Sequence, residues 1–363
     1  MSRTSIRRII TLHFLLLVTL LKALQGIAQD KCHCPIEKQF ADINAKLRQT
    51  NNTERIESRC RELTGNKSPA CRRLGYHSLG VLYFHQNKAG EALTFLEQER
   101  GLLDSLGCDS QMYIDYYLAV GNCYFLNNDP ETAIRWYLKM LSASEAAKDT
   151  ASQAMSLLNI AVVFSMEEQK PKAFEYTKKV IPLIGAVKNK NEQGGLLAGV
   201  AGAYIDFGDL TKSMKYLDTA EYFAKRAIDV FRDLKNNKRV MGLYVSLSHL
   251  YDLQGKPAKC LVYADSAITL SDPSIDRRQL FAAYFNKAST YRKLGQLQRA
   301  IQFTDSALKY ALAFGHYKNI GSAYDLKYEL DTATGNYKAA LEAYIRSRTI
   351  SDSILTAEKS KSI

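Results

Sequence analysis

Apolar residues recur along the chain with the period of an α-helix, and they do so in pairs of segments. Tyr117, Val120, Gly121 and Tyr124 stand at positions i, i+3, i+4 and i+7, which places them on one face of a helix. The polar stretch 127–130 then interrupts the pattern. It ends in a proline, which suits the first turn of a following helix because its missing N–H would have no partner there. The sequence therefore predicts a helix, a turn and a second helix.

The second helix begins its apolar stripe with Ala133 and Tyr137. Small residues at Gly121 and Ala133 allow the two backbones to approach closely, so the predicted unit is an antiparallel helical hairpin.

The hairpin recurs along the chain. Its clearest landmark is an aromatic residue near the end of the first helix, replaced by an aspartate in the last copy. The landmarks are Tyr83, Tyr124, Phe164, Tyr204, Tyr251, Tyr291 and Asp331. They are 40 or 41 residues apart, except for 47 after Tyr204, and such a fixed period indicates a solenoid. We expect a turn at Gly208-Asp209 in the long repeat. The seven extra residues, about two helical turns, should then lengthen its second helix over about 210–234.

On these residues the sequence resembles the tetratricopeptide-repeat family. The family's spacing of large, small and aromatic residues is matched best over residues 114–141 and more loosely in six further units. The resemblance implies an all-α fold, an α-solenoid of stacked hairpins forming a right-handed superhelix. It also implies a scaffold without chemistry of its own, whose first helices line a concave groove that binds a protein or peptide.

Four segments follow from these patterns: a signal peptide (1–28), an N-terminal helical cap (29–73), about seven hairpins (74–355) and a C-terminal tail (356–363). The first combines early arginines, a thirteen-residue apolar stretch and small residues before the expected cleavage point. That stretch is too short to span a bilayer. We therefore predict an exported bacterial protein, periplasmic or secreted, with no transmembrane segment after cleavage. The alternative is an uncleaved N-terminal anchor.

Composition adds three constraints. The length of 363 residues allows about two domains, but the period favours one elongated solenoid. A hydrophobic content of 46% excludes a disordered chain. The formal charge is +12, of which four basic residues belong to the leader, and the remainder is spread over many helices as solvated faces. Export argues against a nucleic-acid partner, and the oligomeric state stays open.

Cysteines fall into two groups. Five lie near the N-terminus, where an oxidising compartment favours disulfides: Cys32, Cys34, Cys60, Cys71 and Cys108. Their pairing is open, and we predict one or two bridges that staple the helices of residues 36–64 onto the first clear repeat. Cys123 and Cys260 take core positions and should be buried free thiols. A metal site at Cys32-His33-Cys34 is the alternative, but it lacks the C-x2-C spacing of zinc sites. No metal or cofactor is predicted.

The groove positions can be read against a subgroup of the resembled family that grips acidic C-terminal tails with two asparagines and three cations. Asn122 and Asn159 take the asparagine places. The cation places hold no charge, being Leu118, Gly195 and Gly199. No carboxylate clamp is therefore predicted. An asparagine pair can still bind a peptide backbone, because each amide both donates and accepts.

A similar pair occurs later, at His249 and Asn286. For all four residues the alternative is a solvated polar side chain on the groove wall. The glycine-rich stretch 194–202 also has two interpretations. Gly199 and Gly202 either expose a bare patch of helix to a ligand or serve close packing or a hinge, since interior glycines cost a helix about 1 kcal/mol each.

Catalysis finds no support in the sequence. It contains no H-E-x-x-H pair, no G-x-S-x-G elbow and no glycine-rich phosphate loop, and its carboxylates are dispersed. His77 and His85, eight residues apart on one helix, are interpreted as a solvated edge. We therefore predict a protein that is not an enzyme.

The last stretch, with Asp352-Ser353, resembles the periplasmic repeat region of bacterial sensor kinases, but no membrane span or kinase module follows in the sequence. That resemblance implies an alternative function, the ligand-sensing input module of a signalling system in truncated form.

Overall fold

The computed structural model describes residues 31–40 and 52–361, with side chains as far as residue 352. The predicted signal peptide lies outside these residues. The described residues form helices and connecting turns, without a strand. They belong to two compact units, unit 1 (residues 1–186) and unit 2 (residues 187–363). The period alone had favoured a single elongated body.

Within the described residues, seven consecutive helix pairs pack as hairpins, α4/α5 through α16/α17, and each contains one predicted landmark in its first helix. The helices of unit 1 are α3 (Thr53–Thr64), α4 (Pro69–His85), α5 (Ala89–Leu106), α6 (Ser110–Leu126), α7 (Pro130–Ala146), α8 (Thr150–Met166), α9 (Lys170–Val180) and the 3-10 helix η1 (Ile181–Ala186). Those of unit 2 are α10 (Lys190–Thr211), α11 (Met214–Asp233), α12 (Asn237–Leu253), α13 (Pro257–Leu270), α14 (Arg277–Lys293), α15 (Leu297–Phe314), α16 (Tyr317–Ala333) and α17 (Tyr337–Lys361).

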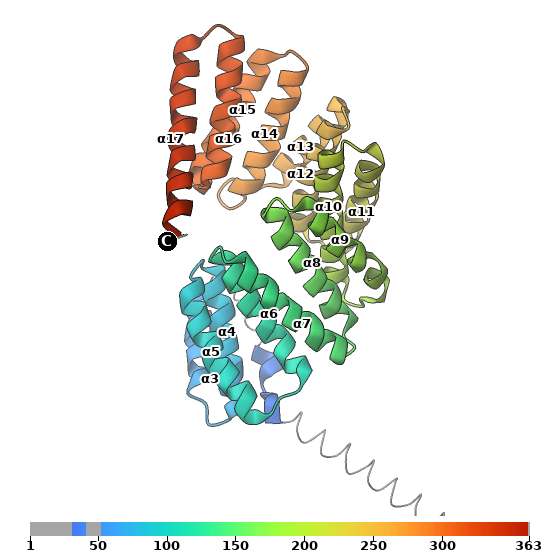
Figure 1. Ribbon diagram of the computed structural model, residues 1–363, viewed down its shortest axis with the longest axis vertical. Helices are drawn as coiled ribbons and strands as arrows, with labels where there is room; N and C mark the ends of the chain where they lie inside the picture. Colours follow the sequence, from blue (N-terminus) through green and yellow to red (C-terminus); the bar gives the residue numbers. More distant parts are fainter. Residues whose placement is uncertain (1–30, 41–51, 362–363) are drawn as a thin grey trace, which may run out of the picture. The chain divides into compact units, whose positions relative to one another are not determined.

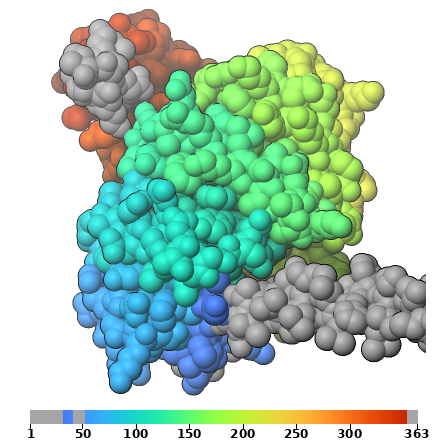
Figure 2. All heavy atoms as spheres, turned by 60° about the horizontal axis from the view of Figure 1, so that its bottom comes forward, coloured from blue at the N-terminus to red at the C-terminus, as the bar shows by residue number. Residues whose placement is uncertain are grey.

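Within each unit, successive helices lie side by side in chain order, as α4 and α5 do in unit 1 and α16 and α17 in unit 2 (Figure 1). In unit 1 the colours on the surface change gradually from blue to green, because each helix packs on the next one along the chain (Figure 2). This arrangement is the predicted α-solenoid. Helix α17 continues to Lys361, so most of the segment taken as a tail is helical.

The predicted turn at residues 127–130 is present. Asn128 has a positive φ of 59°, which asparagine tolerates better than most residues. Asp129 caps α7 by accepting a hydrogen bond from the backbone N–H of Thr132 at 3.0 Å, and Pro130 is the first helical residue. Close approach of the two helices also holds, because a Cβ built on Gly121 would lie 2.6 Å from the Tyr137 ring.

The long repeat differs from the prediction. Helix α10 continues through Gly208 and Asp209 and ends at Thr211, seven residues beyond Tyr204. In α8 and α12 the first helix ends two residues beyond its landmark. Gly208 is buried and packs against Leu217, where a Cβ would lie 2.8 Å from the leucine side chain. Much of the insertion therefore lengthens the first helix, because this glycine serves helix packing instead of a turn.

Two disulfides tie the N-terminal segment (residues 31–40) to the first hairpin. Cys32 pairs with Cys108, just after α5, and Cys34 pairs with Cys71 in α4. The prediction of one or two bridges is confirmed, although they hold the segment before α3, and Cys60 of α3 is buried and belongs to neither bridge. Cys123 and Cys260 are buried and free, as predicted.

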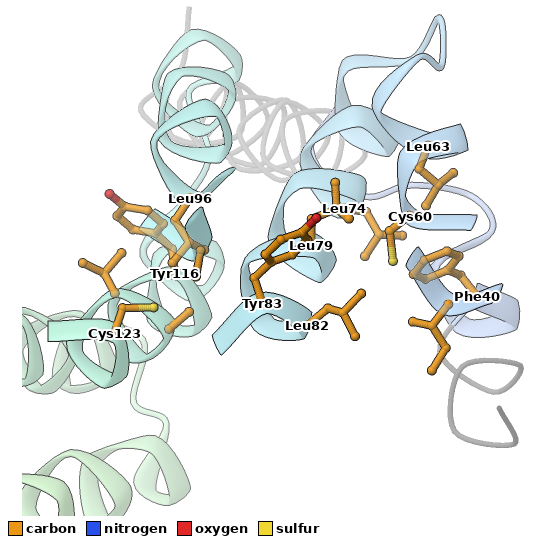
Figure 3. Packing of buried hydrophobic residues seen from close by; sticks show 14 of the residues in the cluster. Phe40, Cys60, Leu63, Leu74, Leu79, Leu82, Tyr83, Leu96, Tyr116 and Cys123 are labelled. Atoms are coloured by element: carbon orange, nitrogen blue, oxygen red, sulfur yellow. The ribbon is translucent and has the colours of Figure 1, made fainter. Parts of the chain in front are cut away.

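The core of unit 1 joins this stapled region to the hairpins. Buried side chains from α3, α4, α5 and α6 form one cluster. Figure 3 shows its side chains spread from Leu63 and Cys60, past Leu79 and Tyr83, to Tyr116. The N-terminal cap is thus continuous with the repeat core, and α4 is fixed on the side that faces α3.

Candidate functional site

The candidate site is a pocket of about 170 Å3 in unit 1, between the first helices of the first two hairpins. Its lining comes from α4 and α6 alone: His77, Val81, Phe84, His85, Asp115, Leu118, Ala119 and Asn122. On each helix these residues recur at intervals of three or four, so each helix contributes one stripe. First helices form the side on which the sequence predicted binding.

A buried ionic network underlies one wall of this pocket. Glu99 of α5 is fully buried. His77 Nδ1 lies 3.0 Å from Glu99 Oε2, and Arg73 Nη1 donates to Glu99 Oε1 at 3.5 Å. Arg73, 4% exposed, also donates to the carbonyl oxygen of Cys32 and to Glu37 Oε1, at 3.2 and 3.4 Å. The stapled segment and two helices therefore hold the His77 ring in place.

Two of the titratable groups that line the pocket, His77 and Asp115, have shifted pKa values. Burial by itself lowers the pKa of His77, but the Glu99 carboxylate more than offsets this effect, aided by Asp115, and the pKa of His77 is raised. Burial also raises the pKa of Asp115, and Glu99 and Glu37 add to this against the opposing charges of His77 and Arg73. Asp115 as a residue is exposed, so its carboxyl group is reachable from solvent although protein surrounds much of it. Two adjacent groups with shifted pKa values in one pocket are a common feature of functional sites.

Asn122, a predicted site residue, lies in this pocket. Its Oδ1 accepts a hydrogen bond from the Tyr137 hydroxyl at 2.7 Å. Tyr137 is buried, and this bond fixes the amide so that its NH2 group stays available to a ligand.

The other predicted polar residues lie elsewhere. Asn159 is half-buried on α8 of unit 1 and does not line the pocket. In unit 2, His249 is exposed on α12. Asn286 of α14 is 9% exposed, and its Nδ2 donates to the carbonyl oxygen of Val245 in α12 at 3.3 Å. The Asn286 amide thus already joins two first helices.

Different glycines of the glycine-rich stretch in α10 fit different interpretations of that stretch. A Cβ on Gly194 would lie 2.9 Å from the Phe231 ring of α11, which is close packing. A Cβ on Gly202 would meet nothing within 4 Å, and Gly199 is only partly buried. Gly199 and Gly202 therefore stay candidates for a bare helix surface in unit 2.

Sequence reasoning missed the polar groups that converge in the pocket. His77 was interpreted as a solvated edge, but it is 21% exposed and bonded to a buried carboxylate, whereas His85 is exposed as expected. The sequence did indicate that Asp115 is unusual, because the corresponding positions in the next two repeats, 40 and 80 residues later, hold the uncharged residues Met155 and Gly195. The partner Glu99 gave none, since its burial depends on how α5 packs.

Metal binding at Cys32-His33-Cys34 is excluded in this structure, because both cysteines are in disulfides. Within residues 31–40 and 52–361, no cluster of three or more histidine, cysteine or acidic side chains is arranged to hold a metal ion. No described helix is both long and apolar enough to cross a membrane.

The hairpins can be compared with known proteins. The tetratricopeptide-repeat family matches residues 281–313, which cover most of the α14/α15 hairpin. The same helix pairing recurs in seven consecutive hairpins of the described chain. Residues 281–313 therefore form a tetratricopeptide repeat, and the other hairpins have the same helix pairing. No protein of curated function matches this repeat protein in sequence.

Solved structures share the fold at low identity. The apo form of the quorum sensor NprR from B. thuringiensis is 13% identical, with a TM-score of 0.65 over 95% of this repeat protein and 96% of that chain. A Rap protein complexed with competence and sporulation factor is 14% identical, with a TM-score of 0.54 over 91% and 98%. A signal transduction ATPase with a tetratricopeptide-repeat sensor, from Pyrococcus horikoshii, is 16% identical, with a TM-score of 0.56 over 85% and 47%.

Proposed function

We propose that this repeat protein is a non-catalytic scaffold that binds a peptide, or an extended segment of a protein, along the first helices of its hairpins. The observation that carries the proposal is the pocket between α4 and α6, on the side made of first helices. Its apolar walls and the oriented amide of Asn122 suit an extended chain, which offers a side chain and a backbone carbonyl at once. The Rap structure named above, a complex with competence and sporulation factor, supports the proposal by analogy of fold.

Selection from a displayed library of random linear peptides tests the binding function. We expect residues 29–363 to enrich peptides, and Asn122→Ala to weaken the enriched peptides about tenfold, the cost of roughly one good hydrogen bond. Tyr137→Phe is the matched control, because it removes the bond that orients the amide but keeps the amide itself, and its effect should be smaller. Asn159→Ala then measures how far along α8 the peptide extends. Binding is refuted if no peptide is enriched, and the Asn122 role is refuted if Asn122→Ala binds as tightly as the wild type.

The proposal includes export. Its support is the leader-like residues 1–28 together with two disulfides, which form and persist in oxidising compartments. Residues 1–28 should therefore direct alkaline phosphatase lacking its own signal out of the cytoplasm and make it active in colonies. Replacing Leu15, Leu16 and Leu17 with charged residues should abolish that activity. An inactive fusion with the intact leader would count against export. Such an exported scaffold has no role in binding nucleic acid.

A second candidate function is the sensory input module. The two structural neighbours described as a quorum sensor and as a sensor of a signal transduction ATPase favour it, again by fold. A ligand-dependent interaction with a membrane-bound signalling protein would distinguish this function from a constitutive scaffold.

A further inference from the structure

The pocket between α4 and α6 combines apolar walls with the Asp115 carboxylate, which has no hydrogen-bond partner in the described structure. We propose that it binds a primary ammonium group on an aliphatic stem, the group that a lysine side chain carries, with Asp115 as its counter-ion, and that proton uptake by His77 releases it. The inference deepens the proposed function by naming the ligand class of that same site.

Size and lining favour an aliphatic stem. The volume of about 170 Å3 corresponds to roughly five or six water molecules, and a lysine side chain has five heavy atoms beyond Cα. Val81, Phe84, Leu118 and Ala119 supply apolar surface for its methylene groups. Lysine commonly buries such a stem against apolar surface while its ammonium group meets polar atoms.

Charge favours a cation. His85 of α4 also lines the pocket and is exposed. The charged groups that act on Asp115 are His77 and Arg73 of α4, Glu99 of α5 and Glu37 of the N-terminal segment. With His77 neutral, these groups and Asp115 together carry two more negative than positive charges. Arg73 is already held by Glu99, Glu37 and the Cys32 carbonyl, so Asp115 is the carboxylate left for a ligand.

His77 couples this site to pH. Its Nδ1 faces Glu99, so the second ring nitrogen, Nε2, is the one left for the pocket that His77 lines. In the neutral ring Nδ1–H donates to Glu99 and Nε2 can accept from an ammonium group. In the protonated ring Nε2 carries a hydrogen and the ring a positive charge, and both oppose a bound ammonium group.

The direction of the pH effect on ligand binding follows from the raised pKa of His77. The free protein holds a proton on His77 to a higher pH than an isolated histidine does, since the pKa is raised. The ammonium group competes with that proton, so it binds best above the pKa of His77 and is released below it. Protonation of Asp115, whose pKa is also raised, acts in the same direction at lower pH.

The orientation of Asn122 favours a peptide as the source of the ammonium group. Its Oδ1 is engaged by Tyr137, which leaves the NH2 group to donate to a backbone carbonyl beside the bound side chain. A free amine has no such carbonyl. Both sources share the ammonium chemistry, and the experiment separates them.

The test uses NMR titration of residues 29–363 with three probes: the tripeptide acetyl-Ala-Lys-Ala-amide, its norleucine analogue and n-butylamine. We expect the lysine peptide to bind at about pH 8.5 at least tenfold more tightly than the norleucine peptide. At about pH 5.5 it should bind at least tenfold more weakly than at the higher pH. The Cε1–H resonance of His77, assigned by its loss in His77→Gln, should titrate at lower pH when the lysine peptide is present.

Substitutions separate the role of Asp115 from that of His77. Asp115→Asn should weaken the lysine peptide at least tenfold and leave the norleucine peptide unchanged. Glu131→Gln, which removes an exposed carboxylate of α7 away from the pocket, should change neither. His77→Gln should flatten the pH dependence between about pH 8.5 and 5.5. Each variant must first show the wild-type amide spectrum outside the pocket, and the comparison of lysine with norleucine on the wild type needs no variant.

Equal binding of the norleucine and lysine peptides would overturn the proposal, as would a His77 resonance that titrates identically with and without the lysine peptide. Binding of n-butylamine as tight as that of the lysine peptide would support the ammonium site but identify a free amine as sufficient. If library peptides bind without needing a lysine, the scaffold function stands and the ammonium site fails. If n-butylamine binds and no library peptide does, the ammonium site stands and the scaffold function fails.

Discussion

Replacing Cys32 and Cys108 with serine should lower the free energy of unfolding of unit 1 by about 2–4 kcal/mol, one of the two largest effects that we expect. The bridge closes a loop between residues 76 positions apart, and a cross-link over such a distance restricts the unfolded chain strongly. It also keeps the Cys32 carbonyl and Glu37 beside Arg73. Its loss therefore weakens the ionic network as well as the chain closure.

Urea unfolding followed by tryptophan fluorescence measures this effect. The single tryptophan, Trp136, lies in α7 of unit 1 and contacts the rings of Tyr116 and Tyr117, so its emission reports on that unit. A reductant should lower the wild-type midpoint in the same way. It should have no effect on a variant in which all four bridged cysteines are serine. A wild-type midpoint that reductant does not move would contradict the prediction.

Glu99→Ala should destabilise unit 1 by about 3–5 kcal/mol. Glu99 is fully buried and is the acceptor for both Arg73 and His77. Removal of one partner from a buried ion pair leaves the other charge without compensation in a medium that solvates it poorly. Arg73, at 4% exposed, cannot move its guanidinium into water without opening the contact between the N-terminal segment and α4.

The same fluorescence assay measures this loss, with Glu97→Gln as control because Glu97 is exposed on the same helix. The control should lie within about 0.5 kcal/mol of the wild type. The double variant Arg73→Met/Glu99→Leu should recover part of the loss, since it removes both charges and fills the space with apolar atoms. A cost below about 1 kcal/mol for Glu99→Ala would show that the network does not stabilise unit 1.

Much of the fold could be predicted because it depends on local pattern. The seven landmarks each lie in the first helix of a hairpin, and the turn at 127–130 has the cap and the proline in their expected places. In the long repeat, by contrast, Gly208 and Asp209 are typical turn residues, yet they are helical. Contact with Leu217 on the neighbouring helix outweighs their local preference, and a single sequence does not show that contact.

The candidate site was predicted only in part, for a related reason. Asn122 was found because its place in the repeat marks it as a first-helix residue on the binding side. His77 and Asp115 were missed because their importance depends on Glu99, which comes from a third helix and is buried only after packing. Asn286 was predicted to bind a ligand in the groove, but its amide already donates a hydrogen bond to the carbonyl oxygen of Val245.

The sequence by itself determined the helical class, the hairpin period, the family resemblance and the region in which disulfides form. Each of these depends on spacings of at most a few dozen residues, which are visible along one chain. Only the tertiary structure decided the disulfide partners, the division at residue 186, and the pocket where a buried carboxylate sets the pKa of a histidine 22 residues away. These features arise when separate helices exclude water from the same charges, and that exclusion has no signature in local periodicity.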